Sequence, residues 1–176
     1  LTAAEQAACN TFFVGLKAQS LWTKFAGLYL FVGGTSGAHA VNWASPGTYT
    51  ITWVNSPTHN ANGVTGNGTT AYGTTGALAS TVCPTNNAHV SAYNRTSSPT
   101  SDGRFIGATS LTGGASRTEL YYDGANWACY GPQENVFNSV AGTSGFLVSS
   151  RTASNARHIR ANATTTADTA ASVIAT

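Results

Sequence analysis

The acidic residues are the first candidates for chemistry, because the 176-residue chain has only six of them. They are Glu5, Asp102, Glu119, Asp123, Glu134 and Asp168. Glu119 and Asp123 are the closest pair, and on one strand four residues of about 3.3 Å each would hold them roughly 13 Å apart. The two carboxyl groups of a glycosidase lie about 5–9.5 Å apart. This spacing argues against a polysaccharide hydrolase.

No other catalytic or cofactor motif stands out. The Gly-Gly-Thr-Ser-Gly run at 33–37 lacks both the spacing of a nucleophile elbow and the Gly-Lys-Ser/Thr ending of a phosphate loop. The three cysteines and four histidines show no zinc-ligand spacing. Asp102, Asp123 and Asn135 are of the type that binds calcium, but no Asp-x-Asp-x-Asp loop surrounds them. We therefore expect no enzyme activity, no metal and no cofactor.

A binding surface is the chemistry that remains. Aromatic side chains with a polar edge can stack on the apolar faces of sugar rings, while amide and guanidinium groups supply directed hydrogen bonds. The alternative is that most of these aromatic residues belong to the core. The candidate ligand-binding residues are Tyr121, Tyr130, Tyr72, Asn60, Asn62, Asn67, Asn94 and Arg95.

The composition describes a polar surface that carries few charges. Hydrophobic residues make up 41% of the chain and charged residues only 8%, whereas soluble domains average about 25% charged residues. A coiled coil would need more Glu and Lys. The net charge of +2 from eight Lys and Arg gives little counterion release, which argues against binding nucleic acid. Because no apolar run reaches about 18 residues, we expect no membrane insertion.

The periodicity of apolar residues predicts one helix followed by strands. Thr2 and Glu5 form a capping-box pattern, and the apolar spacing predicts a helix from about Ala3 to Ala18, with a second short helical segment from Leu21 to Leu28. After residue 29 the period changes to two, as in Tyr49–Val54. The further strand candidates are 88–94, 104–110, 117–122, 126–130, 145–150 and 157–162.

One hairpin can be predicted with its register. Asp123-Gly124 is a favoured two-residue loop, which would place Tyr122 opposite Ala125 and Leu120 opposite Trp127. Leu120, Tyr122, Trp127 and Cys129 would then share the core face, and Tyr121 and Tyr130 would share the exposed one.

We divide the chain into an N-terminal helical segment, residues 1–28, packed on a β-sandwich of residues 29–176, as a single domain overall. Short strands between Gly, Asn, Ser and Pro turns are typical of a sandwich or barrel. The Ala- and Thr-rich tail from 161 to 176 is either a last edge strand or a loose segment.

Several motifs resemble a module of tail, fibre and other virion proteins of bacteriophages, especially those that infect Bacteroidetes. The resemblance extends from about Leu1 to Arg160. The motifs that carry it are 13–17, 21–25, 31–35, 38–42, Trp53 with 67–72, and 145–152.

The resemblance implies a concanavalin A-like (laminin G-type) jelly-roll β-sandwich, in an all-β fold with a short N-terminal α-helix. It further implies a non-enzymatic virion domain, assembled in the bacterial cytoplasm, that contacts a host-surface glycan or other virion proteins. The family usually has further strands after the region around 157–162, whereas this sequence ends at Thr176. Strands that are missing here would leave sheet edges unpaired, and because an exposed edge recruits partners, we expect a homo-oligomer. The alternative is a capsid decoration or fibre-connecting protein that has no ligand.

Overall fold

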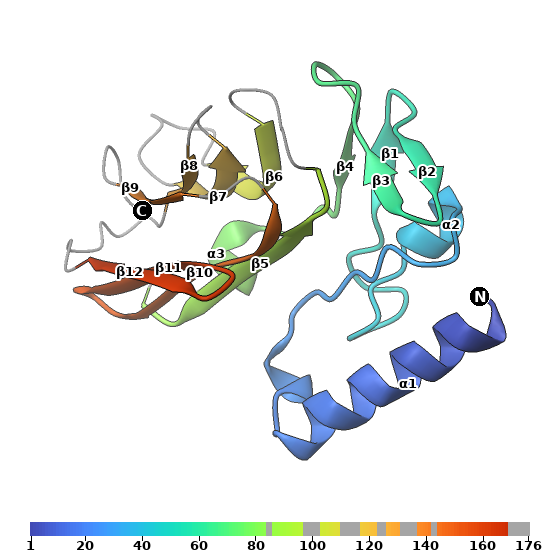
Figure 1. Cartoon of the computed structure of the whole chain (residues 1–176), viewed down its shortest axis with the longest axis horizontal. Coiled ribbons are helices and arrows are strands. Elements are labelled where there is room, and N and C mark those ends of the chain that lie inside the picture. Colours follow the sequence, from blue (N-terminus) through green and yellow to red (C-terminus); the bar gives the residue numbers. More distant parts are fainter. Residues whose placement is uncertain are drawn as a thin grey trace. The chain divides into compact units, whose positions relative to one another are not determined.

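The computed structural model describes residues 1–83, 86–96, 103–109, 117–122, 126–130, 137–141 and 144–168 (Figure 1). Contacts within the chain group it into two units, Leu1–Ala77 and Leu78–Thr176. The first unit contains the N-terminal helix together with residues 29–77.

The N-terminal helix α1 spans Ala3–Ala18, which confirms the predicted helix. Its capping box is complete: the Glu5 amide donates to the Thr2 hydroxyl at 3.2 Å, and the Thr2 amide donates to the Glu5 carboxylate at 2.7 Å. The Gly33 amide also donates to that carboxylate, at 3.2 Å. These hydrogen bonds, chiefly those from Thr2, lower the pKa of Glu5 from its usual value. The same carboxylate thus caps the helix and ties it to the following loop.

Helix α1 packs on aromatic residues of the loops that follow it. The Phe13 ring lies 5.2 Å from Trp22 and 5.3 Å from Trp43, measured between ring centroids, and Cys9 is buried. Trp22 belongs to a short 3-10 helix, η1 (Trp22–Lys24), within the predicted second helical segment. The four-residue helix α2 (Ser36–His39) was not predicted.

Two small two-stranded sheets complete the first unit. Strand β1 (Thr52–Val54) pairs with β4 (Tyr72–Thr74), and β2 (Thr58–Asn60) pairs with β3 (Gly63–Thr65). Strand β1 is shorter than the predicted 49–54, because Tyr49 has a positive φ of 55° that extended strands do not allow.

A buried asparagine holds the loops of this unit together. Asn42 is completely buried, and its Nδ2 donates to the carbonyl oxygens of Ala26 and Thr48 at 3.1 and 3.0 Å. Its Oδ1 accepts from the amides of Leu28 and Ala44 at 3.0 and 3.1 Å. The Nδ2 and Oδ1 atoms of Asn42 thus both have hydrogen-bond partners. These bonds hold irregular backbone in place where no sheet pairs it.

The second unit contains two four-stranded antiparallel sheets and a short helix, α3 (Ala79–Val82). One sheet has the order β12-β11-β10-β5, and the other has the order β6-β7-β8-β9 (Figure 1). The strands are β5 (Ala88–Asn94), β6 (Gly103–Thr109), β7 (Arg117–Tyr122), β8 (Asn126–Tyr130), β9 (Phe137–Ala141), β10 (Gly145–Ala153), β11 (Ala156–Ala161) and β12 (Thr164–Asp168).

The core of this unit draws on both sheets. Leu120 and Tyr122 of β7 cluster with Leu147 of β10 and with Ile159 and Ala161 of β11. Val90, Ala92 and Phe105 pack against this cluster. The described core of this unit therefore joins side chains from both sheets.

The predicted strands 88–94, 117–122 and 126–130 are confirmed, and 104–110, 145–150 and 157–162 shift by at most a few residues. Strand β9 was not predicted. The tail was expected to be either a last edge strand or a loose segment, and within it Thr164–Asp168 form the edge strand β12.

The predicted register of the β7–β8 hairpin is wrong by two residues. Tyr122 pairs with Trp127, and Leu120 pairs with Cys129, so the connection is longer than the two-residue loop that Asp123-Gly124 suggested. An even shift leaves each residue on its predicted side of the sheet. Residues 123–125 and the Trp127 side chain lie outside the described part of the chain.

The structure is therefore mostly β, in several sheets with few helices. Consecutive strands lie side by side within each sheet, except that β5 lies beside β10 and β1 lies beside β4. A jelly roll is built from two Greek keys, and this finer prediction is not confirmed. Within the described ranges, every helix is too short or too polar to cross a membrane.

Candidate functional site

The sheet β12-β11-β10-β5 has one face in the core and one face turned away from it. Along β10 the buried residues are Leu147, Ser149 and Arg151, and the residues between them are more exposed. Strand β11 alternates in the same way. The strand register places the following residues on the side opposite the core, here called the outer face: His89, Ser91, Tyr93, Phe146, Val148, Ser150, His158, Arg160, Thr165 and Ala167.

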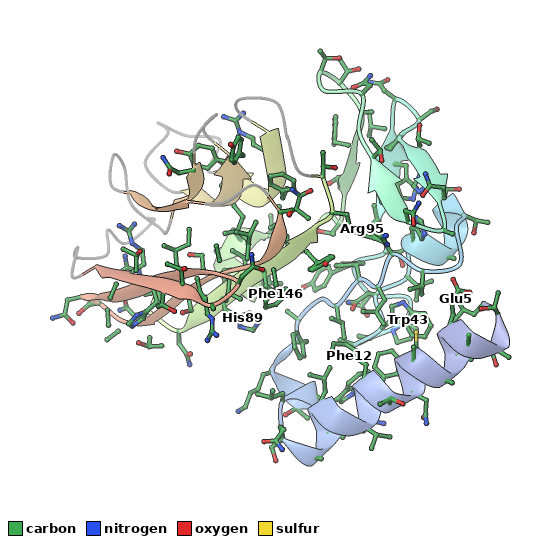
Figure 2. All side chains as sticks on the ribbon, viewed as in Figure 1. Glu5, Phe12, Trp43, His89, Arg95 and Phe146 are labelled. Carbon is green, nitrogen blue, oxygen red and sulfur yellow. The ribbon has the colours of Figure 1, made fainter. Side chains whose placement is uncertain are left out.

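Two large aromatic side chains lie next to each other at one end of the outer face. Tyr93 and Phe146 are direct cross-strand partners, and they are 70% and 48% exposed. Directly opposed residues have Cβ atoms about 4.5–5.5 Å apart. Figure 2 shows Phe146 and His89 on the same side of the sheet. Two adjacent exposed rings form an apolar platform. Because both rings lie on the face opposite the core, packing in the core does not explain why they are there.

The backbone around Phe146 is held by an asparagine. The Phe146 amide donates to Asn162 Oδ1 at 3.0 Å, and the Asn162 amide donates to the Phe146 carbonyl at 2.8 Å. Asn162 Nδ2 also donates to the Ser144 carbonyl at 3.0 Å. Gly145 has a φ of +119°, and a Cβ there would collide with the Asn162 amide. The sequence Gly145-Phe146 therefore suits a fixed, outward-facing aromatic residue.

Polar residues continue the outer face away from the aromatic pair. Arg160 lies opposite Val148, one step along the sheet from Phe146. Its Nε–H donates to the Asn162 carbonyl at 2.7 Å. His158 and His89 flank Ser150 a further step away. The face thus combines an apolar end with hydrogen-bonding groups, which is what recognition of a sugar chain requires.

Two of the sequence candidates lie in unexpected places. Tyr121 is only 6% exposed, so the prediction that it faces solvent is wrong; β7 is a central strand, and both Glu119 and Leu120 beside it are buried as well. Asn94 is buried, and its amide bonds the backbone of Thr96 at 2.8 and 3.1 Å, so it shapes a turn rather than a polar rim.

The remaining candidates are distributed over both units. Asn60 Oδ1 accepts from the Asn62 amide at 2.8 Å, and Asn67 Oδ1 accepts from three successive amides, those of residues 69 to 71. Both therefore stabilise turns of the first unit. Tyr72 is 56% exposed in the same unit. Arg95 is exposed directly after β5, and the Tyr130 side chain lies outside the described residues.

Phe146 and Arg160 were missed by the sequence analysis. The signal was present as the period-two pattern of 145–150, which places Phe146 and Leu147 on opposite faces. It did not show which of the two faces solvent, because each face carries a large apolar residue.

A second cluster of chemical interest lies in the first unit. Nδ1 of His39 is 3.1 Å from Nδ1 of His59, and the Trp53 and Phe31 rings surround the pair, with Trp53 4.7 Å from His59 and Phe31 5.7 Å from His39. His39 is completely buried. Burial, and secondly the neighbouring His59, lower the pKa of His39, so it is neutral at neutral pH.

The His39 environment predicts a pH-dependent stability of the first unit. The unfolded chain binds a proton at His39 below its ordinary pKa of about 6.5, while the folded unit resists protonation. Its stabilising contribution is therefore complete above about pH 6.5 and is lost as the pH falls from there through the lowered folded pKa. His59 is the titratable group in contact with it, since the neighbouring Phe31 and Trp53 are uncharged. We expect the free energy of unfolding, followed by tryptophan fluorescence, to fall as the pH is lowered below about 6.5.

The control is His39→Asn, which keeps a hydrogen-bonding group near the Nδ1 position but does not titrate. It should show a shallower pH dependence over the same range. A wild-type stability that is flat or rises on acidification, or an identical slope in the variant, would contradict the assignment.

Acidic and metal-binding chemistry is sparse in the part of the chain that the structure describes. Glu119 Oε1 lies 3.7 Å from Arg104 Nε, and Glu119 is buried. No cluster of three or more His, Cys, Asp or Glu residues is present within the described ranges. The calcium candidates Asp102, Asp123 and Asn135 lie outside them.

The chain matches no family model, no curated protein and no solved structure.

Proposed function

We propose that the chain is a non-enzymatic bacteriophage virion domain that contacts a host-surface glycan through the outer face of the sheet β12-β11-β10-β5. The observation that carries this proposal is the exposed cross-strand pair Tyr93 and Phe146. The resemblance of the sequence motifs to phage virion modules supplies the biological setting.

The chemistry of the pair suits a sugar. One face of many pyranose rings presents C–H bonds, which lie favourably against an aromatic ring, while their hydroxyl groups need hydrogen-bonding partners at the edge of the contact. Ser91, Ser150 and Arg160 supply such groups next to the platform. Because the fixed register positions both rings before binding, little conformational entropy is lost on association.

The arrangement of the second unit also supports a binding module. Two antiparallel sheets around one core resemble the layered architecture that lectin and capsid domains use. We propose membership of the concanavalin A-like sandwiches as the finer fold assignment.

Assembly with other virion proteins and with further copies of this chain belongs to the same proposal. Strands β12 and β5 lie at the two edges of their sheet in the described structure, and edge strands can pair with another chain. Such an oligomer would present several copies of the outer face, and multivalent contact raises the avidity for a repetitive polysaccharide.

The test is a binding measurement with the assembled protein on an array of bacterial surface polysaccharides and on intact cells of candidate hosts. We expect binding without release of reducing ends. Absence of binding to every glycan and cell would favour the structural alternative, a decoration or connecting protein. Cleavage of a polysaccharide that is abolished in Glu119→Gln would overturn the assignment as a non-enzyme.

A further inference from the structure

We infer that the outer face recognises an anionic polysaccharide, with Arg160 binding a carboxylate on a sugar next to the one that stacks on Tyr93 and Phe146. This inference rests on the proposed function and specifies the class of ligand.

Arg160 lies within reach of the aromatic platform. It pairs with Val148, two residues along β10 from Phe146, and such diagonal neighbours are about 7–8 Å apart. A sugar stacked on the rings and a neighbouring sugar over Arg160 can therefore belong to one polysaccharide chain. The exposed Arg160 side chain needs no rearrangement to meet a ligand.

The guanidinium group is oriented and still has donors to offer. Its Nε–H is engaged by the Asn162 carbonyl at 2.7 Å, which restricts the side chain. Its two terminal NH2 groups have no acceptor among the described residues. Two parallel N–H donors match the two oxygens of a carboxylate, and such charge-assisted pairs are stronger than neutral hydrogen bonds. Asn162 thus acts as a positioning residue for both Phe146 and Arg160.

The charge of the outer face favours the same ligand. Arg160 carries a positive charge there, and none of the described positions of this face is acidic. Among the described carboxylates, Glu5 belongs to the first unit and Glu119 is buried in the other sheet. In the strand register Asp168 pairs with Arg157 and not with an outer-face position. An anion approaching this face therefore meets a positive group without repulsion from a neighbouring described carboxylate.

The experiment compares polygalacturonate with its carboxyl-reduced, neutral form. We expect the wild-type assembly to bind the acidic polymer roughly tenfold more tightly at low salt, with the difference shrinking as salt is added. Arg160→Gln should remove most of this preference, so that the variant binds the acidic and the neutral polymer with nearly equal affinity. Arg160→Lys should restore only part of it, because lysine cannot form the bidentate pair. Lys24→Gln, which removes one charge from the first unit, is the matched control and should behave as the wild type.

The outcomes separate this inference from the proposed function. Equal affinity for the acidic and neutral polymers, or an Arg160→Gln variant that keeps the preference, would overturn the anionic ligand while leaving a neutral glycan in place. An equal loss of preference in Lys24→Gln would show that net charge alone is responsible, and would overturn the role of Arg160. Binding to neither polymer, together with no binding on the polysaccharide array, would overturn the proposed function itself.

Discussion

Replacing Leu147 by alanine is expected to lower the free energy of unfolding of the second unit by about 2–5 kcal/mol. Leu147 is 1% exposed and sits in the cluster that joins the two sheets. The substitution removes apolar contacts and leaves a cavity, because a closely packed core cannot relax enough to fill it. Because domains are stable by only about 5–15 kcal/mol, the variant should unfold at a clearly lower urea concentration.

Leu78→Ala is the matched control for this prediction. Leu78 belongs to the same unit and is 68% exposed, so its loss should change stability by no more than about 0.5 kcal/mol. Similar costs for the two variants would contradict a core shared by the sheets. So would a Leu147→Ala protein with the urea midpoint of the wild type.

Replacing Tyr93 by alanine is expected to weaken glycan binding at least about tenfold, which corresponds to about 1.4 kcal/mol. Truncating an aromatic anchor at the centre of a contact removes most of its binding free energy. Stability should change by less than about 1 kcal/mol, the range of an exposed cross-strand pair. Affinity is measured by titration against the polysaccharide that binds best on the array.

Two further variants make this prediction specific. Tyr93→Phe keeps the ring and should retain most of the affinity. Tyr72→Ala removes a tyrosine of the first unit that is also exposed and should leave the affinity unchanged. If Tyr72→Ala weakened binding and Tyr93→Ala did not, the contact surface would lie on the first unit, where the sequence had also placed candidates.

Elements with strong local signals could be predicted from the sequence. The Thr2–Glu5 capping box fixed the start of α1, because both of its reciprocal hydrogen bonds form within one turn. Strands such as Ala88–Asn94 were recognisable from their alternation and from the turn residues that flank them. The length of strand β1 was overestimated, because Tyr49 has a positive φ. That conformation depends on how the loop packs, and the local sequence pattern does not indicate it.

The faces of the strands were harder to predict, because they depend on what lies across the sheet. Arg151 and Arg157 are almost completely buried and directly opposed, while Phe146 is exposed. Hydrophobicity alone would place the two arginines on the solvent face and Phe146 on the core face, which is the reverse of what the structure has. Tyr121 was placed on a solvent face by alternation, yet both faces of β7 are covered. The functional surface could therefore be found only once tertiary packing had shown which side of β10 is the outer one.

The most direct test of the glycan-contact surface is hydroxyl-radical footprinting of the protein with and without a bound polysaccharide. In the free protein, the exposed side chains of Tyr93, Phe146, Tyr72 and Leu78 should all be oxidised. On binding, we expect protection at Tyr93 and Phe146, with Tyr72 and Leu78 unchanged. Protection confined to the first unit, with Tyr93 and Phe146 oxidised as before, would contradict the assignment of this sheet face.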